Sequence, residues 1–361
     1  MNILYVVMAC FSLIAALDRA TGNHLGMGKE FEKGIMILGT LTFSMVGMLL
    51  AAPLFAELLL PVTSLVSRHT PFDPSVIMGM LIANDMGAAP LSLSLASSEE
   101  IGYFNGLVVG AMMGATISFS IPFALKTIDK EYHDDVFVGM LCGLATIPLG
   151  CLVSGIMLKL PIVALLVDLI PVTLFSAVVM IALLKVPDLC VKVFSMIGKV
   201  LGIVIILGLA LGIFEFLTGK AIIKGLAPLS EGMDVVINAS AVMTGAFPLI
   251  NVVSRVLNRP LLWIGKKTGF DKISVIGFVS SMATVATSYL MVGDMSKKGR
   301  IANLAFSVSG AFTFAGHLAF TMSINPSYVF PVIVGKLVSG FSSIFVAIFI
   351  YNKMYKKSCE N

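Results

Sequence analysis

Charged residues are scarce in this chain. Asp, Glu, Lys and Arg together make up 12% of its 361 residues, whereas hydrophobic residues make up 58%. Soluble domains carry about twice that share of charge, near 25%. The composition therefore excludes a soluble domain and predicts a polytopic membrane protein that depends on a lipid bilayer.

Paired cysteines and the motifs of soluble enzymes are also missing. The five cysteines stand at positions 10, 142, 151, 190 and 359 with no CxxC, a pattern that favours neither disulfides nor a metal site. No P-loop, HExxH or GxSxG occurs, and the four histidines are scattered. The 22 methionines are spread over the apolar segments, as is typical of core packing. These absences favour a permeation protein over an enzyme, with no cofactor, metal or nucleic acid.

Apolar segments of the length that crosses a bilayer, about 20 residues, recur along the chain. They predict nine membrane helices, near 2–17, 34–52, 101–125, 136–158, 161–184, 193–217, 234–253, 300–325 and 329–352. Two further apolar segments, 76–96 and 275–293, are irregular. The fold class predicted is an all-α polytopic membrane protein.

The first irregular segment carries Asn84 and Asp85 at its centre, followed by Gly87 and Pro90. A carboxylate at bilayer depth costs about 2.5 to 3.5 kcal/mol and normally faces water, a partner or a substrate. The glycine and proline interrupt the helix, and broken helices at this depth line cavities or are buried in protein. The segment therefore predicts a binding site, with a kinked helix and a purely structural Asp85 as the alternative.

An internal repeat relates the two halves of the chain at an offset of about 198 residues. Collinear matches include Gly34 with Gly232, Gly47 with Gly245, Phe72-Asp73 with Phe270-Asp271, Gly79 with Gly277 and Gly139 with Gly335. The repeat predicts four regions: a first membrane repeat over 1–158, a linker span over 159–192, a second membrane repeat over 193–352, and a cytoplasmic tail over 353–361. It also places the two irregular segments in corresponding positions, which is where transporters bind substrate.

The placement of cations predicts how the irregular segments meet the membrane. Of 24 Lys and Arg, Lys199 and Lys336 lie within spans, where we expect their long side chains to extend toward the surface. If both irregular segments are re-entrant, the other 22 divide into 18 cytoplasmic and four external. If both cross fully, the division is 12 to ten. Since cytoplasmic loops are enriched in Lys and Arg, re-entrance and inverted repeats are favoured.

Several motifs resemble the ethanolamine permease family of bacterial ethanolamine-utilisation operons, over essentially the whole chain. The motifs are Ala15-Leu-Asp-Arg19 with Gly22-Asn23, Leu81-Ile-Ala-Asn-Asp-Met-Gly87, Gly245-Ala-Phe-Pro-Leu249, Gly293-Asp-Met295 and Gly316-His-Leu-Ala-Phe320. The resemblance implies a multi-pass protein of the bacterial cytoplasmic membrane that takes up ethanolamine.

Two positions depart from the family pattern. An Asn-Asn pair of the family is replaced by Thr284-Val285, and an Asp that precedes the histidine is replaced by Gly316. Both changes remove polar groups from the second half, so substrate identity beyond a small amino alcohol stays open.

The chemistry of a small hydroxylated ammonium ion fits the polar residues of the irregular segments. A carboxylate pairs with an ammonium, amides and hydroxyls address an alcohol, and aromatic faces add cation–π attraction. The substrate-binding residues predicted are Asn84, Asp85, Thr284, Tyr289, Asp294 and His317. Among these, Asp85 is expected to pair with the ammonium and Asp294 to matter less.

Other buried acids and other functions complete the expectations. Asp18 is expected to cap a helix and Asp168 to make a structural contact. A cation-coupled symporter of another small polar solute, or a non-transporting membrane scaffold or sensor, remains an alternative to the permease. The sequence leaves coupling, affinity and oligomeric state open.

Overall fold

Helices account for all the regular structure of the described residues. The computed structural model describes residues 3–356, apart from the side chains of residues 62, 191, 253–254, 257–268 and 355–356. No strand occurs within this part of the chain, and eight helical stretches in it are long and apolar enough to cross a membrane. The all-α polytopic class is therefore confirmed. The predicted tail, 353–361, lies largely outside the described residues.

The first half of the chain runs from α1 to α9 and leads into the linker helix α10. Its elements are α1 (Ile3–Ala20), α2 (Gly28–Leu41), η1 (Thr42–Val46), α3 (Gly47–His69), α4 (Val76–Leu81), η2 (Asn84–Met86), α5 (Ala88–Leu95), α6 (Glu99–Tyr103), η3 (Phe104–Gly114), η4 (Thr116–Ser120), α7 (Ile121–Thr127), η5 (Lys130–Tyr132), α8 (His133–Leu144), α9 (Ile147–Met157) and α10 (Ile162–Lys185). Most of the run from 99 to 127 is π-helical, a wider helix that often occurs near functional sites.

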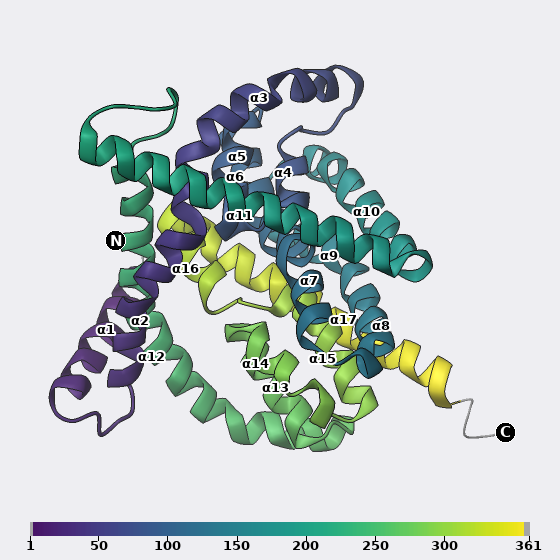
Figure 1. Cartoon of the computed structure of the whole chain (residues 1–361). Coiled ribbons are helices and arrows are strands. Elements are labelled where there is room, and N and C mark those ends of the chain that lie inside the picture. The colour runs from purple at the N-terminus through teal and green to yellow at the C-terminus, as the bar shows by residue number, and fades with distance from the viewer. Residues whose placement is uncertain (1–2, 357–361) are drawn as a thin grey trace.

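The second half contains longer helices. Its elements are α11 (Pro187–Thr218), α12 (Leu229–Thr268), α13 (Lys272–Ala283), α14 (Val285–Leu290), η6 (Val292–Asp294), α15 (Lys297–Gly310), α16 (Gly316–Ile324), η7 (Pro326–Tyr328), α17 (Val329–Tyr351) and η8 (Asn352–Lys356). In the view of Figure 1, α4 and α5 lie in the upper part and α13 and α14 in the lower part. Between them in this view lies α16.

The predicted span 300–325 is not one continuous helix, which corrects the expectation of nine unbroken spans. It divides into α15 and α16, joined by a turn over residues 311–315. The N–H groups of Phe312 and Phe314 donate to the carbonyls of Ser281 and Met282 at the end of α13, each at 3.0 Å. Because these partners replace the lost helical hydrogen bonds, the break is tolerated in the apolar interior.

Each irregular segment is clamped at its ends by one aspartate. Before α4, Asp73 Oδ2 accepts the N–H and the hydroxyl of Ser97, at 2.8 and 2.6 Å. Before α13, Asp271 Oδ2 accepts the same two groups of Ser296, at 3.1 and 2.6 Å. In both halves, therefore, the chain returns after the irregular segment to the point where it entered.

Glycines bring the two halves into direct backbone contact. Gly47 of α3 lies against the carbonyl of Ile205 in α11, so closely that a Cβ atom would clash. Gly245 of α12 lies in the same way against the carbonyl of Met8 in α1. Gly47 matches Gly245 at an offset of 198, and Met8 matches Ile205 at 197. The first helix of each half, α1 or α11, thus packs against a glycine of the other half.

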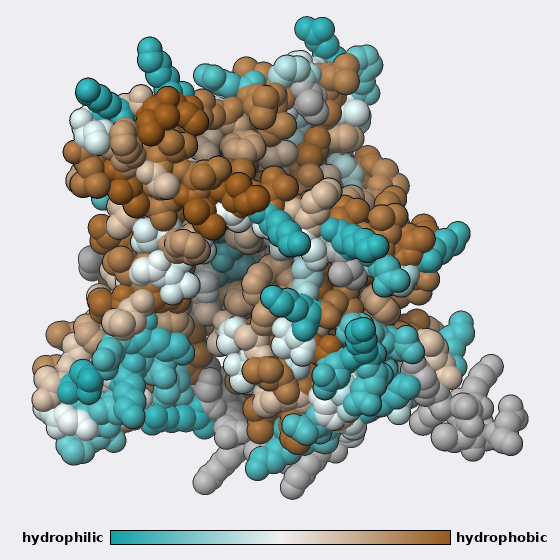
Figure 2. All heavy atoms as spheres, in the orientation of Figure 1, coloured by the Kyte–Doolittle hydropathy of each residue, from teal (hydrophilic) through white to brown (hydrophobic). Residues whose placement is uncertain are grey.

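The outer surface is apolar over much of its height. In Figure 2, hydrophobic residues cover the upper and middle parts of the visible face, and hydrophilic residues gather at the upper rim and in the lower part. Large side chains such as Leu174 and Leu184 of α10 and Leu207 of α11 are more than half exposed. Such a surface suits contact with lipid.

Candidate functional site

The helix of the first irregular segment breaks just before Asn84. Ile82 and Ala83 have extended backbone conformations, and Gly87 has a positive φ of 115°, which glycine adopts without strain. The N–H of Ala83, freed by the break, donates to the hydroxyl of Ser118 in η4 at 3.2 Å. Residues 84–86 therefore form a single turn, η2, held between α4 and α5.

Asn84 and Asp85 have different surroundings on this turn. Asn84 is fully buried, and neither atom of its side-chain amide has a hydrogen-bond partner among the described residues. An unpaired buried amide costs about 1 to 3 kcal/mol, so a ligand that supplied a partner would recover that energy. The side chain of Asp85 is 30% exposed and so opens onto accessible space. A carboxylate and an unsatisfied amide thus lie side by side at the break.

Asp85 faces the beginning of α16. Its Oδ1 lies 4.0 Å from Nε2 of His317. Gly316 borders the other carboxylate oxygen, since a Cβ atom there would lie 3.6 Å from Oδ2. The N-terminal end of a helix favours a negative charge, so α16 stabilises the carboxylate. The structure therefore brings two separated motifs together, the Asn84-Asp85 pair of the first half and His317 of the second half.

Lys336 is the residue that the sequence reasoning missed. It lies in α17 and is 1% exposed, so the expectation that its side chain extends to the surface is wrong. Its ammonium donates to the carbonyl of Ala111 at 2.6 Å and lies 3.0 Å from Nδ1 of His317. Since an ammonium can only donate, Nδ1 accepts. The buried Lys336 and His317 thus form a row that ends at the partly exposed Asp85.

The other predicted site residues lie apart from this row. Thr284 forms the break between α13 and α14, where its hydroxyl accepts the N–H of Ala286 at 3.3 Å. Tyr289 is buried in α14 and its hydroxyl lies 3.0 Å from that of Ser307. Asp294 is exposed at the end of η6. No hydrogen bond or ion pair within the described residues joins these three to Asp85.

A row of aromatic rings connects Tyr289 with His317. Ring centroids are 6.1 Å apart from Tyr289 to Phe123, 5.1 Å from Phe123 to Phe119, 5.7 Å from Phe119 to Phe312 and 5.3 Å from Phe312 to His317. The three phenylalanines are partly exposed, whereas Tyr289 and His317 are buried. Accessible ring faces of this kind attract cations. Tyr289 is therefore linked to the Asp85 region through rings that the sequence reasoning did not select.

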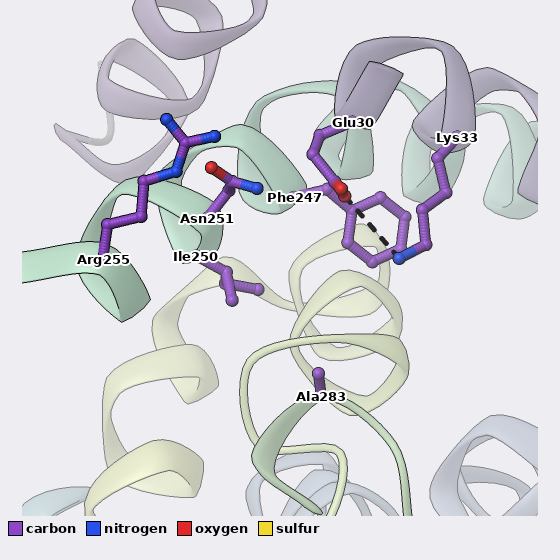
Figure 3. Close-up of a pocket in the computed structure, with 7 residues that line it drawn as sticks. All are labelled: Glu30, Lys33, Phe247, Ile250, Asn251, Arg255 and Ala283. Atoms are coloured by element: carbon purple, nitrogen blue, oxygen red, sulfur yellow. Dashed lines mark ion pairs between the residues drawn. The ribbon is translucent and has the colours of Figure 1, made fainter. Parts of the chain in front are cut away.

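A hollow with a volume of about 340 Å³ lies between α2, α12 and the end of α13. Figure 3 shows its lining residues: Glu30, Lys33, Phe247, Ile250, Asn251, Arg255 and Ala283. The ammonium of Lys33 lies 3.6 Å from the Glu30 carboxylate and 4.6 Å from the centre of the Phe247 ring. Ala283 directly precedes Thr284, so this hollow reaches the second break. A carboxylate and a ring already hold an ammonium there.

Asp18 and Asp168 have the structural contacts expected of them. Asp18 accepts the N–H groups of Leu25, Met27 and Gly28 at 2.7 to 2.9 Å, and so holds the start of α2. Asp168 of α10 accepts the N–H of Asp73 at 2.7 Å and the amide of Asn105 at 3.2 Å. These contacts support the region around the site.

Comparisons with known proteins point to one family. The sequence model described as "Ethanolamine utilisation protein, EutH" matches residues 1–350. The chain is 39% identical to a "Probable ethanolamine permease EutH" of Listeria monocytogenes, over 99% of this chain and 96% of that protein. It is 32% identical to a protein of the same name in Escherichia coli, over 98% and 96%. It is also 33% identical to an "Uncharacterized protein YxeR" of Bacillus subtilis, over 92% and 90%. No solved structure matches.

Proposed function

Because the chain belongs to the EutH family of ethanolamine utilisation proteins, we propose that it is a permease that takes up protonated ethanolamine across the bacterial cytoplasmic membrane. The eight apolar spans suit a multi-pass membrane protein of this kind. Relatives that cover nearly the whole chain carry the name of a probable ethanolamine permease.

The observation that carries this proposal is the partly exposed carboxylate of Asp85 beside the unpaired amide of Asn84. A protonated primary amine donates charge-assisted hydrogen bonds, the stronger kind, to a carboxylate. In the proposed complex Asp85 holds the ammonium, and the two-carbon chain places the hydroxyl against Asn84. The amide nitrogen donates to that hydroxyl or its oxygen accepts from it, so either partner satisfies a buried group.

The repeat supports an inverted arrangement of the two halves. The clamps Asp73–Ser97 and Asp271–Ser296 return each irregular segment to its own starting point, as a re-entrant segment requires. The reciprocal contacts of Gly47 with Ile205 and of Gly245 with Met8 have the form of an approximate two-fold relation. In this arrangement the two segments enter the membrane from opposite sides, and their breaks meet the substrate path at mid-depth. In this proposal, Tyr289 and Thr284 contact the substrate while it moves along the path, and not while it is bound at Asp85.

Uptake of radiolabelled ethanolamine into proteoliposomes tests the proposal. The Asp85→Asn variant keeps the shape of the side chain and removes the charge. Losing one partner of a desolvated charge pair costs about 2 to 5 kcal/mol, so initial uptake should fall roughly 30-fold or more. Asp294→Asn makes the same change at an exposed position and should leave uptake within about twofold, as for other surface substitutions.

Three results would contradict the proposal. Uptake unchanged by Asp85→Asn in a folded protein would remove Asp85 from the site. Wild-type protein that gives no more flux than protein-free liposomes would favour a scaffold or sensor. Flux of another small polar solute in place of ethanolamine, dependent on an imposed sodium or proton gradient, would favour a symporter.

A further inference from the structure

Lys336 places a positive charge close to Asp85, where the positively charged substrate is proposed to bind. It lies two turns beyond the start of α17, and its side chain is almost completely enclosed. A charged residue at membrane depth is costly and normally marks a substrate or proton pathway. The ammonium has two hydrogen-bond partners, the carbonyl of Ala111 and Nδ1 of His317. Neither partner carries a negative charge.

The groups that face Lys336 come from several elements. His317 approaches from α16, the Asp85 carboxylate from η2 and the buried Cys151 thiol from α9. Of these groups only the Asp85 carboxylate carries a negative charge, since a thiol is neutral until it loses its proton. On α8 and α15, which also pack against α17, Asp135 pairs instead with Arg300 at 2.7 Å. Asp85 therefore balances the charge of Lys336 across the His317 ring while no substrate is bound.

Substrate binding upsets this balance. One carboxylate would face two ammonium groups, one on the substrate and one on Lys336. They would be separated by at most the 3.0 Å and 4.0 Å contacts of His317, the width of its ring, and the contact of the substrate ammonium with the Asp85 carboxylate. At such a separation, repulsion between two unit charges in protein weakens binding on the order of tenfold or more. The repulsion vanishes if Lys336 gives up its proton.

We propose that Lys336 exchanges its proton for the substrate ammonium, so that each ethanolamine taken up is accompanied by one proton moving out. This inference rests on the proposed function. The substrate ammonium arrives at Asp85, one N–H bond of the Lys336 ammonium breaks, and the nitrogen keeps the electron pair. The proton leaves to water on the side from which the substrate came, by way of His317, which contacts both Lys336 and the Asp85 region. After the substrate leaves to the cytoplasm, Lys336 takes a proton from that side. The cycle moves no net charge.

Wild-type protein in proteoliposomes tests this exchange without any substitution. Uptake is measured with and without an inside-negative potential, set by a potassium gradient and valinomycin, while a trapped dye reports the internal pH. The exchange predicts that the initial rate changes by less than about 1.5-fold and that the interior becomes alkaline by one proton per ethanolamine, above the change in protein-free liposomes. Without exchange, one positive charge would move inward, and an imposed potential of ordinary size would raise accumulation by several tens of fold.

Three variants sharpen the test. Lys336→Met removes the exchangeable proton, so its remaining uptake should become potential-driven and should not alter internal pH. Lys336→Arg keeps a charge that proteins do not remove, and uptake should fall roughly tenfold or more, as the repulsion between two cations requires. Lys199→Met, at an exposed position in α11, is the matched control and should behave as wild type.

The outcomes separate the two proposals. Wild-type uptake that rises with the potential and leaves internal pH unchanged would overturn the exchange and leave the permease standing. Absence of wild-type uptake would overturn both. Should Lys336→Met not fold, the wild-type measurement still decides.

Discussion

The two irregular segments are held in place by corresponding residues, but the residues at their breaks differ in polarity. In each half an aspartate clamps the ends of the segment, and a glycine of the segment packs against an asparagine of the helix that follows, Gly79 against Asn105 and Gly277 against Asn303. The first break carries Asn84 and Asp85, whereas the second carries Thr284 and Val285.

The other polar residues of the site also lack polar counterparts at the corresponding positions of the first half. At the repeat offsets of 198 and 196, His317 corresponds to Phe119 and Lys336 to Met140. The two irregular segments therefore share their clamps, but the proposed binding chemistry is assembled once, from the break of the first half and from α16 and α17 of the second. Because backbone clamps and binding groups use different residues, one can change without the other.

The largest expected difference between the two segments is the side of the membrane from which each one enters. Single cysteines replace Arg68 and Glu99 around the first segment, and Lys272 and Lys298 around the second, in a background without native cysteines. In intact cells a membrane-impermeant thiol reagent should label the first pair fully and the second pair only after lysis, because inverted segments open to opposite sides.

Within each pair the two cysteines must behave alike. Labelling of Lys272→Cys but not of Lys298→Cys in intact cells, or the reverse, would mean that the second segment crosses the membrane and would refute re-entrance.

The two breaks should also differ in what their polar residues contribute to transport. Asn84→Leu removes an amide that has no hydrogen-bond partner among the residues that the structure describes, so stability should be kept while uptake falls roughly ten- to hundredfold, the size of a hydrogen bond to a charged or buried group. Thr284→Val removes one hydroxyl that accepts a local N–H, and uptake should change by about twofold at most. Initial rates and thermal unfolding in detergent measure the two effects. Equal losses in both variants would mean that the second break binds substrate as strongly as the first.

The smallest effect concerns the clamp of the second half. Burial by itself would raise the pKa of Asp271, but hydrogen bonds from Ser274 and Ser296 outweigh it and lower the pKa to about 2. A carboxyl whose pKa is lower in the folded state stabilises the fold above its ordinary pKa near 4, and this stabilisation is lost as the pH falls toward 2. Because the group is largely solvent-screened, we expect about 1 kcal/mol.

Thermal unfolding of wild type and Asp271→Asn measures this contribution. Wild type should be the more stable protein at pH 6, and the difference in Tm should shrink as the pH approaches 3. Asp294→Asn, an exposed acid of the same half, is the control and should show no such trend. A difference in Tm that stays constant over this range would argue against the clamp as an ionised carboxylate.

The sequence predicted those features that depend on local patterns. Asn84 and Asp85 within an apolar run, followed by Gly87 and Pro90, identified the first break. The repeat that the collinear glycines indicate stays a prediction. The break between α15 and α16 was missed because its stability comes from the carbonyls of Ser281 and Met282, which are distant neighbours rather than local signals. Gly310 and Gly316 at its two ends were the local hint.

Lys336 shows a second limit of sequence reasoning. The expectation that a long cationic side chain reaches the membrane surface considers only its own helix. The actual position depends on Ala111 and His317, which belong to other helices and provide acceptors in the interior. The roles of Asn84, Asp85, Thr284, Tyr289, Asp294 and His317 in substrate binding stay predictions, although the structure places Asn84, Asp85 and His317 together and Asp294 apart from them.

The reciprocal contacts of Gly47 with Ile205 and of Gly245 with Met8 have a consequence for how the protein is made in the cell. While the first half leaves the ribosome, α1 and α3 already lie in the membrane, but the helices that cover them, α12 and α11, do not yet exist. Gly47 and the Met8 carbonyl must therefore face lipid until their partners Ile205 and Gly245, 158 and 237 residues further along the chain, are inserted. A chain interrupted after the linker helix α10 would leave both contact surfaces uncovered, as a substrate for membrane proteases, whereas two fragments divided within that linker could still complete one another.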